Sequence, residues 1–209
     1  MSSAASPRLA APAASLAAFG LQRRVVEVEK SAGRALGCVL HQLGDAVFVD
    51  SCHEEAARCA LPVGSILLRV NREAAPRDLK KTSVRITESS RLRLELLTHA
   101  QAREVRVGGG AEARGLSLAP AGPYARVLRV DEHSEAHRAG IQPGDLVLAM
   151  NGAMLPSVRA AHRVLRTPHE LTLRIFSGDL LNMGADWAAF MRTVAHLQAV
   201  ELPRSPVAS

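Results

Sequence analysis

The chain has 209 residues, of which 47% are hydrophobic and 22% are charged, a composition typical of a globular protein. No uninterrupted apolar run reaches the roughly 18 residues that a membrane-spanning helix needs, so the composition excludes a transmembrane protein. The formal net charge of +6 raises the question of nucleic-acid binding, but the arginines are scattered among acidic residues and form no long basic run. We therefore expect no nucleic-acid partner.

The N-terminal segment differs in composition from the rest of the chain. Residues 1–20 are rich in Ala, Ser and Pro, with one Arg and no acidic residue. Such a segment buries too little side-chain surface to offset the entropy lost on ordering, which predicts a disordered tail. A mitochondrial transit peptide over residues 1–24 is the alternative, because Arg8, Arg23 and Arg24 precede the first acidic residue.

The cysteines bear on the compartment. Cys38, Cys52 and Cys59 form an odd set without a recognisable spacing, which argues against a disulfide framework. This pattern favours a reducing environment, and we expect a cytoplasmic protein unless the N-terminal segment directs it to mitochondria.

The middle of the chain repeats itself at an offset of 80 residues. Residues 54–71 (EEAARCALPVGSILLRVN) match residues 134–151 (SEAHRAGIQPGDLVLAMN) without a gap, and the same offset carries Val47 onto Val127. The repeat predicts two domains, over residues 21–99 and 100–177.

Each copy predicts the same order of elements, five strands and two helices joined by Gly- and Pro-containing turns. The fold class is mainly β (α+β), two partly open β-sandwich or barrel units with two helices each. The expected strands and helices, in chain order, are an opening strand (25–29 and 103–107), a second strand (36–40 and 115–119), a third strand (46–49 and 125–130), a short helix (54–59 and 135–139), a fourth strand (66–70 and 146–150), a second helix (78–87 and 157–166) and a closing strand (91–97 and 171–176).

The C-terminal region, residues 178–209, predicts an amphipathic helix over 179–200 that ends before Pro203. Its apolar residues recur at three- and four-residue spacing and therefore share one face: Leu180, Met183, Trp187, Phe190, Met191, Val194 and Leu197. We expect this face to pack on its own domain, because an exposed stripe of this size would need a partner. A partner-binding or oligomerising helix is the alternative.

The order of elements and the residues at their junctions resemble the PDZ domain. In the second unit GLSL (115–118) stands where the family has a Gly-Leu-Gly-Phe loop, and residues 134–152 match its helix, Gly-Asp turn and Asn-Gly strand end. The first unit is more divergent, with ALGC (35–38) at the loop. The run at 127–143 is also similar to the tandem PDZ of the Golgi-stacking GRASP proteins, but this chain has neither their myristoylated glycine nor their permuted strand order.

The resemblance implies a non-enzymatic adaptor that captures a C-terminal or internal peptide segment as an added strand between the second strand and second helix of a unit. Backbone N–H groups would hold the terminal carboxylate, Leu36 and Leu116 would line the pocket for the terminal apolar side chain, and Arg34 and Arg114 would add positive charge. The expected N–H donors are those of Leu36, Gly37 and Cys38 in the first unit and of Leu116, Ser117 and Leu118 in the second.

The second helix of each unit is expected to set specificity. Its groove-facing residues are Leu79, Ser83 and Ile86 in the first unit and Val158, His162 and Leu165 in the second. Because Leu79 and Val158 cannot form side-chain hydrogen bonds, they predict an apolar peptide residue two positions before the terminus.

Pro120 distinguishes the two grooves. An added strand bonds to alternate residues, so the second unit would offer Leu118 and then Pro120, which has no N–H. The first unit would offer Cys38 and Leu40. The sequence therefore predicts that the first unit binds peptide better, and that the second is structural or binds an internal segment.

The sequence predicts no catalytic residue, cofactor or metal. His133 and His137 flank Glu135 but lack a third ligand, and Cys52 and His53 lack a second Cys/His pair at ligand spacing. No nucleophile elbow or phosphate-binding loop occurs. The alternative from another functional class is a structural or chaperone-like module whose grooves are occupied from within by residues 179–200.

Overall fold

The computed structural model describes residue 16 and residues 20–53, 61–75, 78–155, 157–177 and 183–199, with side chains in the last segment from 190 to 198. Most of the expected N-terminal tail, the expected helix over 54–59, Cys59 and the side chain of Trp187 lie outside the described residues. Leu16 belongs to the expected tail but is only 6% exposed, because it packs into a hydrophobic core between the two sheets. No described helix is long and apolar enough to cross a membrane.

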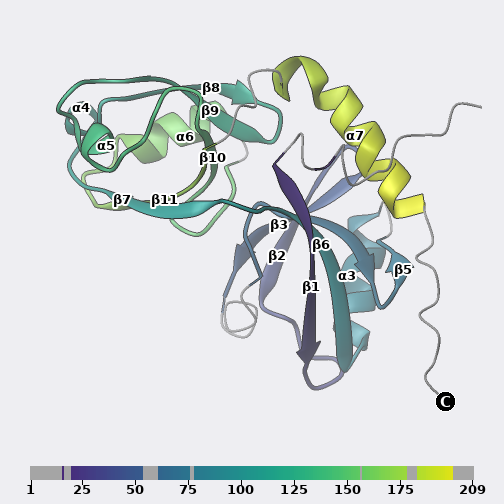
Figure 1. Ribbon diagram of the computed structural model, residues 1–209. Helices are drawn as coiled ribbons and strands as arrows, with labels where there is room; N and C mark the ends of the chain where they lie inside the picture. Colours follow the sequence, from purple (N-terminus) through teal and green to yellow (C-terminus); the bar gives the residue numbers. More distant parts are fainter. Residues whose placement is uncertain are drawn as a thin grey trace, which may run out of the picture.

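Two antiparallel sheets make up the fold, and their strands follow the same order, as the repeat predicts (Figure 1). The first sheet runs β1-β6-β4-β3-β2, formed by β1 (Leu21–Glu29), β6 (Arg91–His99), β4 (Ile66–Val70), β3 (Ala46–Cys52) and β2 (Cys38–Leu43), with β5 (Glu73–Ala74) paired to β4. The second runs β7-β11-β10-β9-β8, formed by β7 (Arg103–Val107), β11 (Leu171–Phe176), β10 (Leu146–Met150), β9 (Tyr124–Val130) and β8 (Leu116–Ala121). The mainly β fold class is confirmed, and β2 and β8 are edge strands.

One longer helix accompanies each sheet. Helix α3 (Leu79–Glu88) begins at Asp78, whose side chain accepts the N–H groups of Lys80 and Lys81, and α6 (Val158–Leu165) begins at Ser157, which accepts that of Ala160. These caps satisfy N–H groups that a helix start leaves without partners. The second unit also contains α5 (Glu135–Arg138) and a short helix that the sequence did not predict, α4 (Ala111–Arg114).

An asparagine closes the fourth strand of each unit in the same way. Asn71 and Asn151 have left-handed backbones, with φ of 53° and 50°. Their side-chain oxygens accept the N–H groups of Arg93 at 2.8 Å and Thr172 at 3.0 Å in the closing strand. Asn tolerates this conformation better than most residues, so the Asn-ended strand found in both copies of the sequence has a structural reason.

The described residues form three hydrophobic cores, one within each unit and one between them. The third, here called the shared core, draws residues from both sheets and from α7 (Met183–Ala199): Leu16, Leu21, Ala46, Phe48, Ile66, Leu68, Leu97, Ala121, Tyr124, Leu146, Leu148, Met154, Phe176, Phe190, Val194 and Leu197. Strand β4 alternates between cores: Leu67 and Val70 face the first unit's own core, whereas Ile66 and Leu68 face the shared core. The central strands are therefore buried on both faces.

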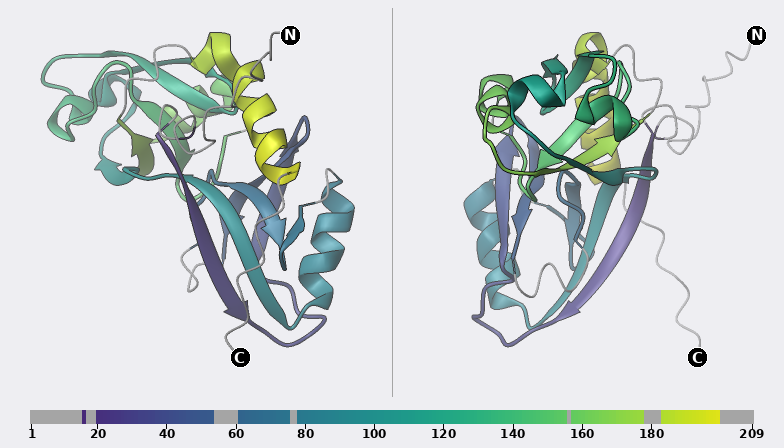
Figure 2. Two further views of the ribbon diagram at one scale, coloured as in Figure 1. Left: turned by 45° about the vertical axis from the view of Figure 1, so that its right-hand side comes forward. Right: turned by 90° about the vertical axis from the view of Figure 1, so that its left-hand side faces the viewer.

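Helix α7 packs on strands of both units. It contacts β3 and β4 of the first sheet and β8 of the second (Figure 2). Phe190, Val194 and Leu197 are each 1% exposed. The guanidinium of Arg69 in β4 donates to the carbonyl oxygens of Leu197 and Gln198 at 3.3 and 3.4 Å, near the negative end of the helix dipole. The expectation that this helix packs on the domain next to it is therefore too narrow, because it also returns to the first unit.

Polar contacts fix the two units against each other. The buried hydroxyl of Tyr124 donates to the carbonyl oxygen of Gly64 at 2.7 Å. The backbone N–H of Met154 donates to the backbone carbonyl oxygen of Asp50 at 2.8 Å. The ring of Tyr124 also meets Phe48 edge-on, with centroids 6.4 Å apart. Burial raises the pKa of Tyr124, so its hydroxyl remains a donor across the physiological range.

His99 is a buried histidine at the junction of the units. It is 4% exposed and lies between Tyr124 and Phe176, with ring centroids 5.5 and 4.6 Å away. Within the described part of the chain neither ring nitrogen has a hydrogen-bond partner. Burial lowers the pKa of His99 from 6.5 to about 4, and nearby Arg174 contributes further.

This burial predicts a loss of stability in mild acid. Above pH 6.5 His99 is neutral in both the folded and unfolded states; between pH 6.5 and about 4 only the unfolded state takes up the proton. The free energy of unfolding should therefore fall by about 3 kcal/mol across this interval on account of His99. Urea unfolding at a series of pH values measures it, and His99→Phe should flatten the dependence.

The exposed His169 supplies a matched control. His169→Phe should leave the pH dependence as in the parent protein, because it makes the same substitution at an exposed position and leaves the buried His99 in place. A His99→Phe profile that parallels the parent's would show that His99 is not the group responsible.

Candidate functional site

The edge strand β8 presents backbone groups to solvent at alternate residues. The N–H of Val127 in β9 donates to the backbone carbonyl of Asp145, and the carbonyl of Val127 accepts the N–H of Gly144, both at 2.8 Å. The backbone groups of Val127 therefore point away from β8. Leu118 lies opposite Val127 and therefore has its own N–H and C=O at the open edge. By the same alternation Leu116 and Pro120 face this edge, and Pro120 offers no N–H.

A pocket of about 210 Å³ lies at the start of β8, between this strand and α6. It is lined by Arg114, Leu116, His162, Leu165 and Arg166. The structure thus brings together four residues that the sequence assigned to peptide binding. Arg166 was not predicted, although a basic residue directly after a helix is a recognisable signal for charge near the helix end.

Arg114 has a different role from the one expected. It is fully buried, and its guanidinium donates to the carbonyl oxygens of Leu165, of Thr167 at 2.7 Å and of His169. These carbonyls lie at the end of α6, where a helix leaves them without partners. Arg114 is therefore a buried cap for α6 as well as a wall of the pocket, and the exposed Arg166 is the cation that a ligand can reach.

Arg34 is not the structural counterpart of Arg114. It is exposed, and the corresponding helix end in the first unit is held by Lys30, whose ammonium donates to the carbonyl oxygen of Thr87 at 2.8 Å. The expectation that both arginines act alike is therefore wrong, because two different residues stabilise the two helix ends.

The loop before the second strand also aligns differently from the sequence repeat. Gly37 and Gly115 both have positive φ, 76° and 59°, and their carbonyls accept the N–H groups of His53 and Asp131 at 2.7 and 2.8 Å. The structural offset here is 78 residues, not 80. The second unit is longer by two residues between Val127 and Asp145 than the first is between the corresponding Val49 and Ser65.

This offset moves the expected carboxylate loop of the first unit. The residues that correspond to Leu116, Ser117 and Leu118 are Cys38, Val39 and Leu40. Leu36 packs in the first unit's own core, 2% exposed, and it lies two residues before Cys38, the residue that corresponds to Leu116. The assignment of Leu36 and Gly37 to the carboxylate site is corrected accordingly, whereas Cys38 and Leu40 stay at the open edge.

The second helices correspond as the sequence predicted. The caps Asp78 and Ser157 align, so Leu79, Ser83 and Ile86 match Val158, His162 and Leu165. In the first unit Cys38, Leu40 and Leu79 pack partly buried around the core that contains Ile86, and Ser83 is exposed. The side-chain oxygen of Gln42 in β2 accepts the N–H of Leu79 at 3.2 Å, which links the strand to the start of α3.

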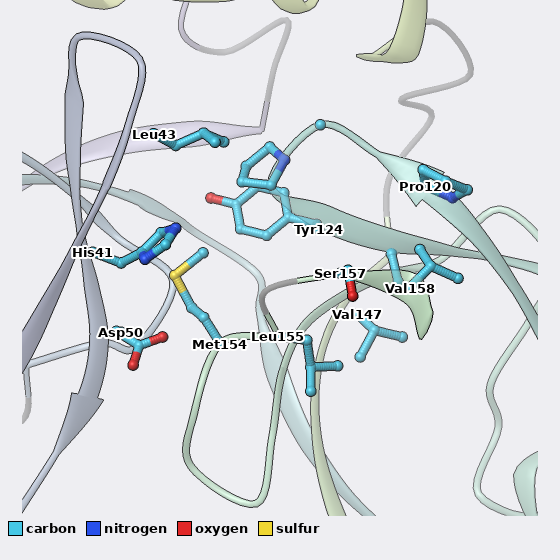
Figure 3. A pocket seen from close by; sticks show the side chains of 13 residues that line it. His41, Leu43, Asp50, Pro120, Tyr124, Val147, Met154, Leu155, Ser157 and Val158 are labelled. Atoms are coloured by element: carbon cyan, nitrogen blue, oxygen red, sulfur yellow. The ribbon is translucent and has the colours of Figure 1, made fainter. Parts of the chain in front are cut away.

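The far end of the second unit's groove opens into a larger cavity. Val158 and Pro120 line a space of about 290 Å³ that reaches His41, Leu43 and Asp50 of the first unit (Figure 3). Val158 therefore lies apart from the pocket around Leu116, at the opposite end of the groove.

The candidate catalytic and metal groups are unremarkable. Cys38 and Cys52 are free thiols opposite each other in β2 and β3; burial raises the pKa of both, that of Cys52 to about 12, so neither is a thiolate at neutral pH. The rings of His133 and His137 are 6.3 Å apart, and no cluster of three potential metal ligands occurs in the described part of the chain.

Comparison with known proteins gives one family. A model of the PDZ domain matches residues 126–175. Similar solved structures include INAD PDZ45 in complex with NG2 peptide (14% identity over 74% of this chain and 88% of that one, TM-score 0.32) and MUPP1 PDZ4 (21% identity over 42% of this chain and 91% of that one, TM-score 0.35). No curated protein sequence matches.

The two arginines give a matched stability test. Arg114→Met leaves three carbonyl oxygens at the end of α6 without their donor, and we expect the free energy of unfolding to fall by about 2–4 kcal/mol. Arg34→Met, at the exposed position, should change it by less than about 0.5 kcal/mol. Equal effects in denaturant titrations would contradict the capping role.

Proposed function

We propose that this chain, whose residues 126–175 match a model of the PDZ domain, is an adaptor that captures protein C-termini, or short internal segments, by adding a peptide strand to the open edge of β8. PDZ domains are modules for protein interaction, which supports a binding function over a catalytic one. The observation that carries the proposal is the pocket around Leu116, which lies at the head of a groove between an edge strand and a helix.

The groove contains the groups that a peptide terminus needs. The N–H of Leu118 at the open edge would bond the peptide backbone, and that of Leu116, which faces the same edge at the start of β8, would hold the carboxylate. The N–H of Ser117, which the sequence also assigned to the carboxylate, faces β9 instead. Leu116 and Leu165 give the pocket an apolar wall for the terminal side chain. The exposed Arg166 would attract the carboxylate, as an ionised hydrogen-bond partner does.

Two observations favour the second unit over the first as the binding unit. The pocket around Leu116 belongs to the second unit. In the first unit the side-chain oxygen of Gln42 in β2 already accepts the N–H of Leu79 in α3, which links the strand to the helix. Pro120, on which the sequence-based preference for the first unit rests, removes one strand bond but leaves Leu118 intact. The first unit stays the second candidate, because Leu40 has its backbone groups at an equivalent open edge.

The alternative of grooves filled from within by residues 179–200 has less support. Phe190, Val194 and Leu197 of α7 are buried in the shared core, and Met191 packs partly buried against it. The same burial leaves this part of the helix little apolar surface with which to form oligomers.

One pair of substitutions identifies the binding unit. His162 and Ser83 occupy corresponding exposed positions on α6 and α3, so His162→Glu and Ser83→Glu should both fold. For a heptapeptide selected from a random pool with free carboxylates, His162→Glu should weaken binding at least about tenfold through repulsion and obstruction. Ser83→Glu should leave the affinity unchanged, as measured by calorimetry.

The possible outcomes separate the candidates. The reverse pattern would assign binding to the first unit, and loss in both variants would assign it to both grooves. Binding that survives amidation of the peptide terminus would show recognition of an internal segment. No binding by the full chain would contradict the proposed function.

Arg166 offers a second test with a neighbouring control. Arg166→Gln removes the exposed cation from the pocket and should reduce affinity for the free carboxylate about three- to tenfold, with less effect at high salt. Arg163→Gln removes the same charge from an exposed position outside the pocket lining and should have little effect. Equal losses would point to general electrostatic attraction, not to a contact in the pocket.

A further inference from the structure

We propose that the cavity between the two units is a second subsite of the groove, which takes a basic side chain, Lys or Arg, two to four residues before the end of the bound peptide. This inference rests on the proposed function of the second unit. It assigns the first unit a direct part in specificity, through Asp50 and His41.

The cavity lies at the far end of the groove from the pocket around Leu116. Val158 and Pro120 belong both to the end of the groove and to the cavity wall. From Leu165 in the pocket around Leu116 to Val158 the helix advances seven residues, or about 10 Å. An extended peptide covers that distance in about three residues, at roughly 3.3 Å each. A residue two to four positions before the terminus therefore reaches the cavity.

Pro120 stands where strand pairing would otherwise continue. Because it has no N–H, the peptide loses one of its two bonds to β8 at this residue and is held in line with the strand less firmly, by the carbonyl of Pro120 alone. The peptide is thus free to turn towards the cavity. The sequence alone counts Pro120 against binding in the second groove. In the proposed complex the peptide leaves the sheet edge at this same residue.

The walls of the cavity match a side chain with an apolar stem and a positive end. Most of the lining is apolar and includes Leu43, Tyr124, Val147, Met154 and Leu155. The first unit contributes a carboxylate, Asp50, and an imidazole, His41 (Figure 3). The long aliphatic stems of Lys and Arg pack well on apolar surface while their heads seek a polar partner.

The carboxylate of Asp50 is available to such a partner. It is half-buried, and within the described residues it has no cation at ion-pair distance and no hydrogen bond to its side chain. Its backbone carbonyl, in contrast, is fixed by the N–H of Met154 at 2.8 Å. A partly desolvated carboxylate without a counter-charge favours a cation over a neutral or acidic side chain.

The shared core holds this subsite in place. Ser51, next to Asp50, forms an isolated bridge with Ala153, and the buried Tyr124 hydroxyl ties the second unit to Gly64. The carboxylate of Asp50 is therefore presented to the groove by packing between the units, and not by a mobile loop.

The experiment compares alanine-based heptapeptides that end in leucine with a free carboxylate. Each carries Lys, norleucine or Glu at one of the positions two, three and four before the terminus, and binding to the full chain is measured by calorimetry. At one or more positions we expect Lys to bind about tenfold more tightly than norleucine, and Glu more weakly. Asp50→Asn should abolish the preference for Lys while leaving the affinity for the norleucine peptide unchanged.

Asp45→Asn is the matched control, because it makes the same change of charge in the exposed turn of the same hairpin, outside the cavity. It should keep the preference for Lys. Peptides that bind without any preference for Lys, or with a preference that survives Asp50→Asn, would overturn the subsite and leave the proposed function standing. Failure of every peptide to bind would overturn both.

Discussion

The packing of the two sheets against each other is the constraint on which the rest of the structure depends. Strands β4 and β10 each alternate between the core of their own unit and the shared core, so both faces of both strands are buried. Separating the units would expose the second face to water, which opposes separation in proportion to the apolar area. Helix α7 completes the same core, and Arg69 fixes its C-terminal end to β4.

This packing also gives the candidate site its form. The groove between β8 and α6 begins in a pocket that belongs to the second unit alone, but its far end opens against β2 and β3 of the first. A tandem arrangement is often treated as two independent binding modules. Here the fixed contact through Tyr124 and Met154 makes the first unit part of the second unit's surroundings.

Local signals in the sequence predicted much of the fold. Apolar alternation and turn residues placed β4, β7, β10 and β11 at their observed bounds, and the spacing of Leu79, Ser83 and Ile86 correctly matched α3 to α6. The alignment of the two copies was wrong before the second strand, because the units differ in length by two residues after it. A fixed offset paired Leu36 with Leu116. The positive φ of Gly37 and Gly115 instead aligns Cys38 with Leu116. The clue was available in the glycines, because each marks the same turn before the edge strand.

The sequence by itself determined the order of strands and helices and the likeness to the PDZ domain, because periodicity, caps and turns act over a few residues. Only the tertiary structure decided which arginine is buried, because Arg34 and Arg114 have similar neighbours in the chain but different ones in space. It also decided where Asp50 lies relative to Val158. The position of Asp50 beside Val158 depends on how residues far apart in the sequence pack against each other. A local sequence pattern carries no information about that packing.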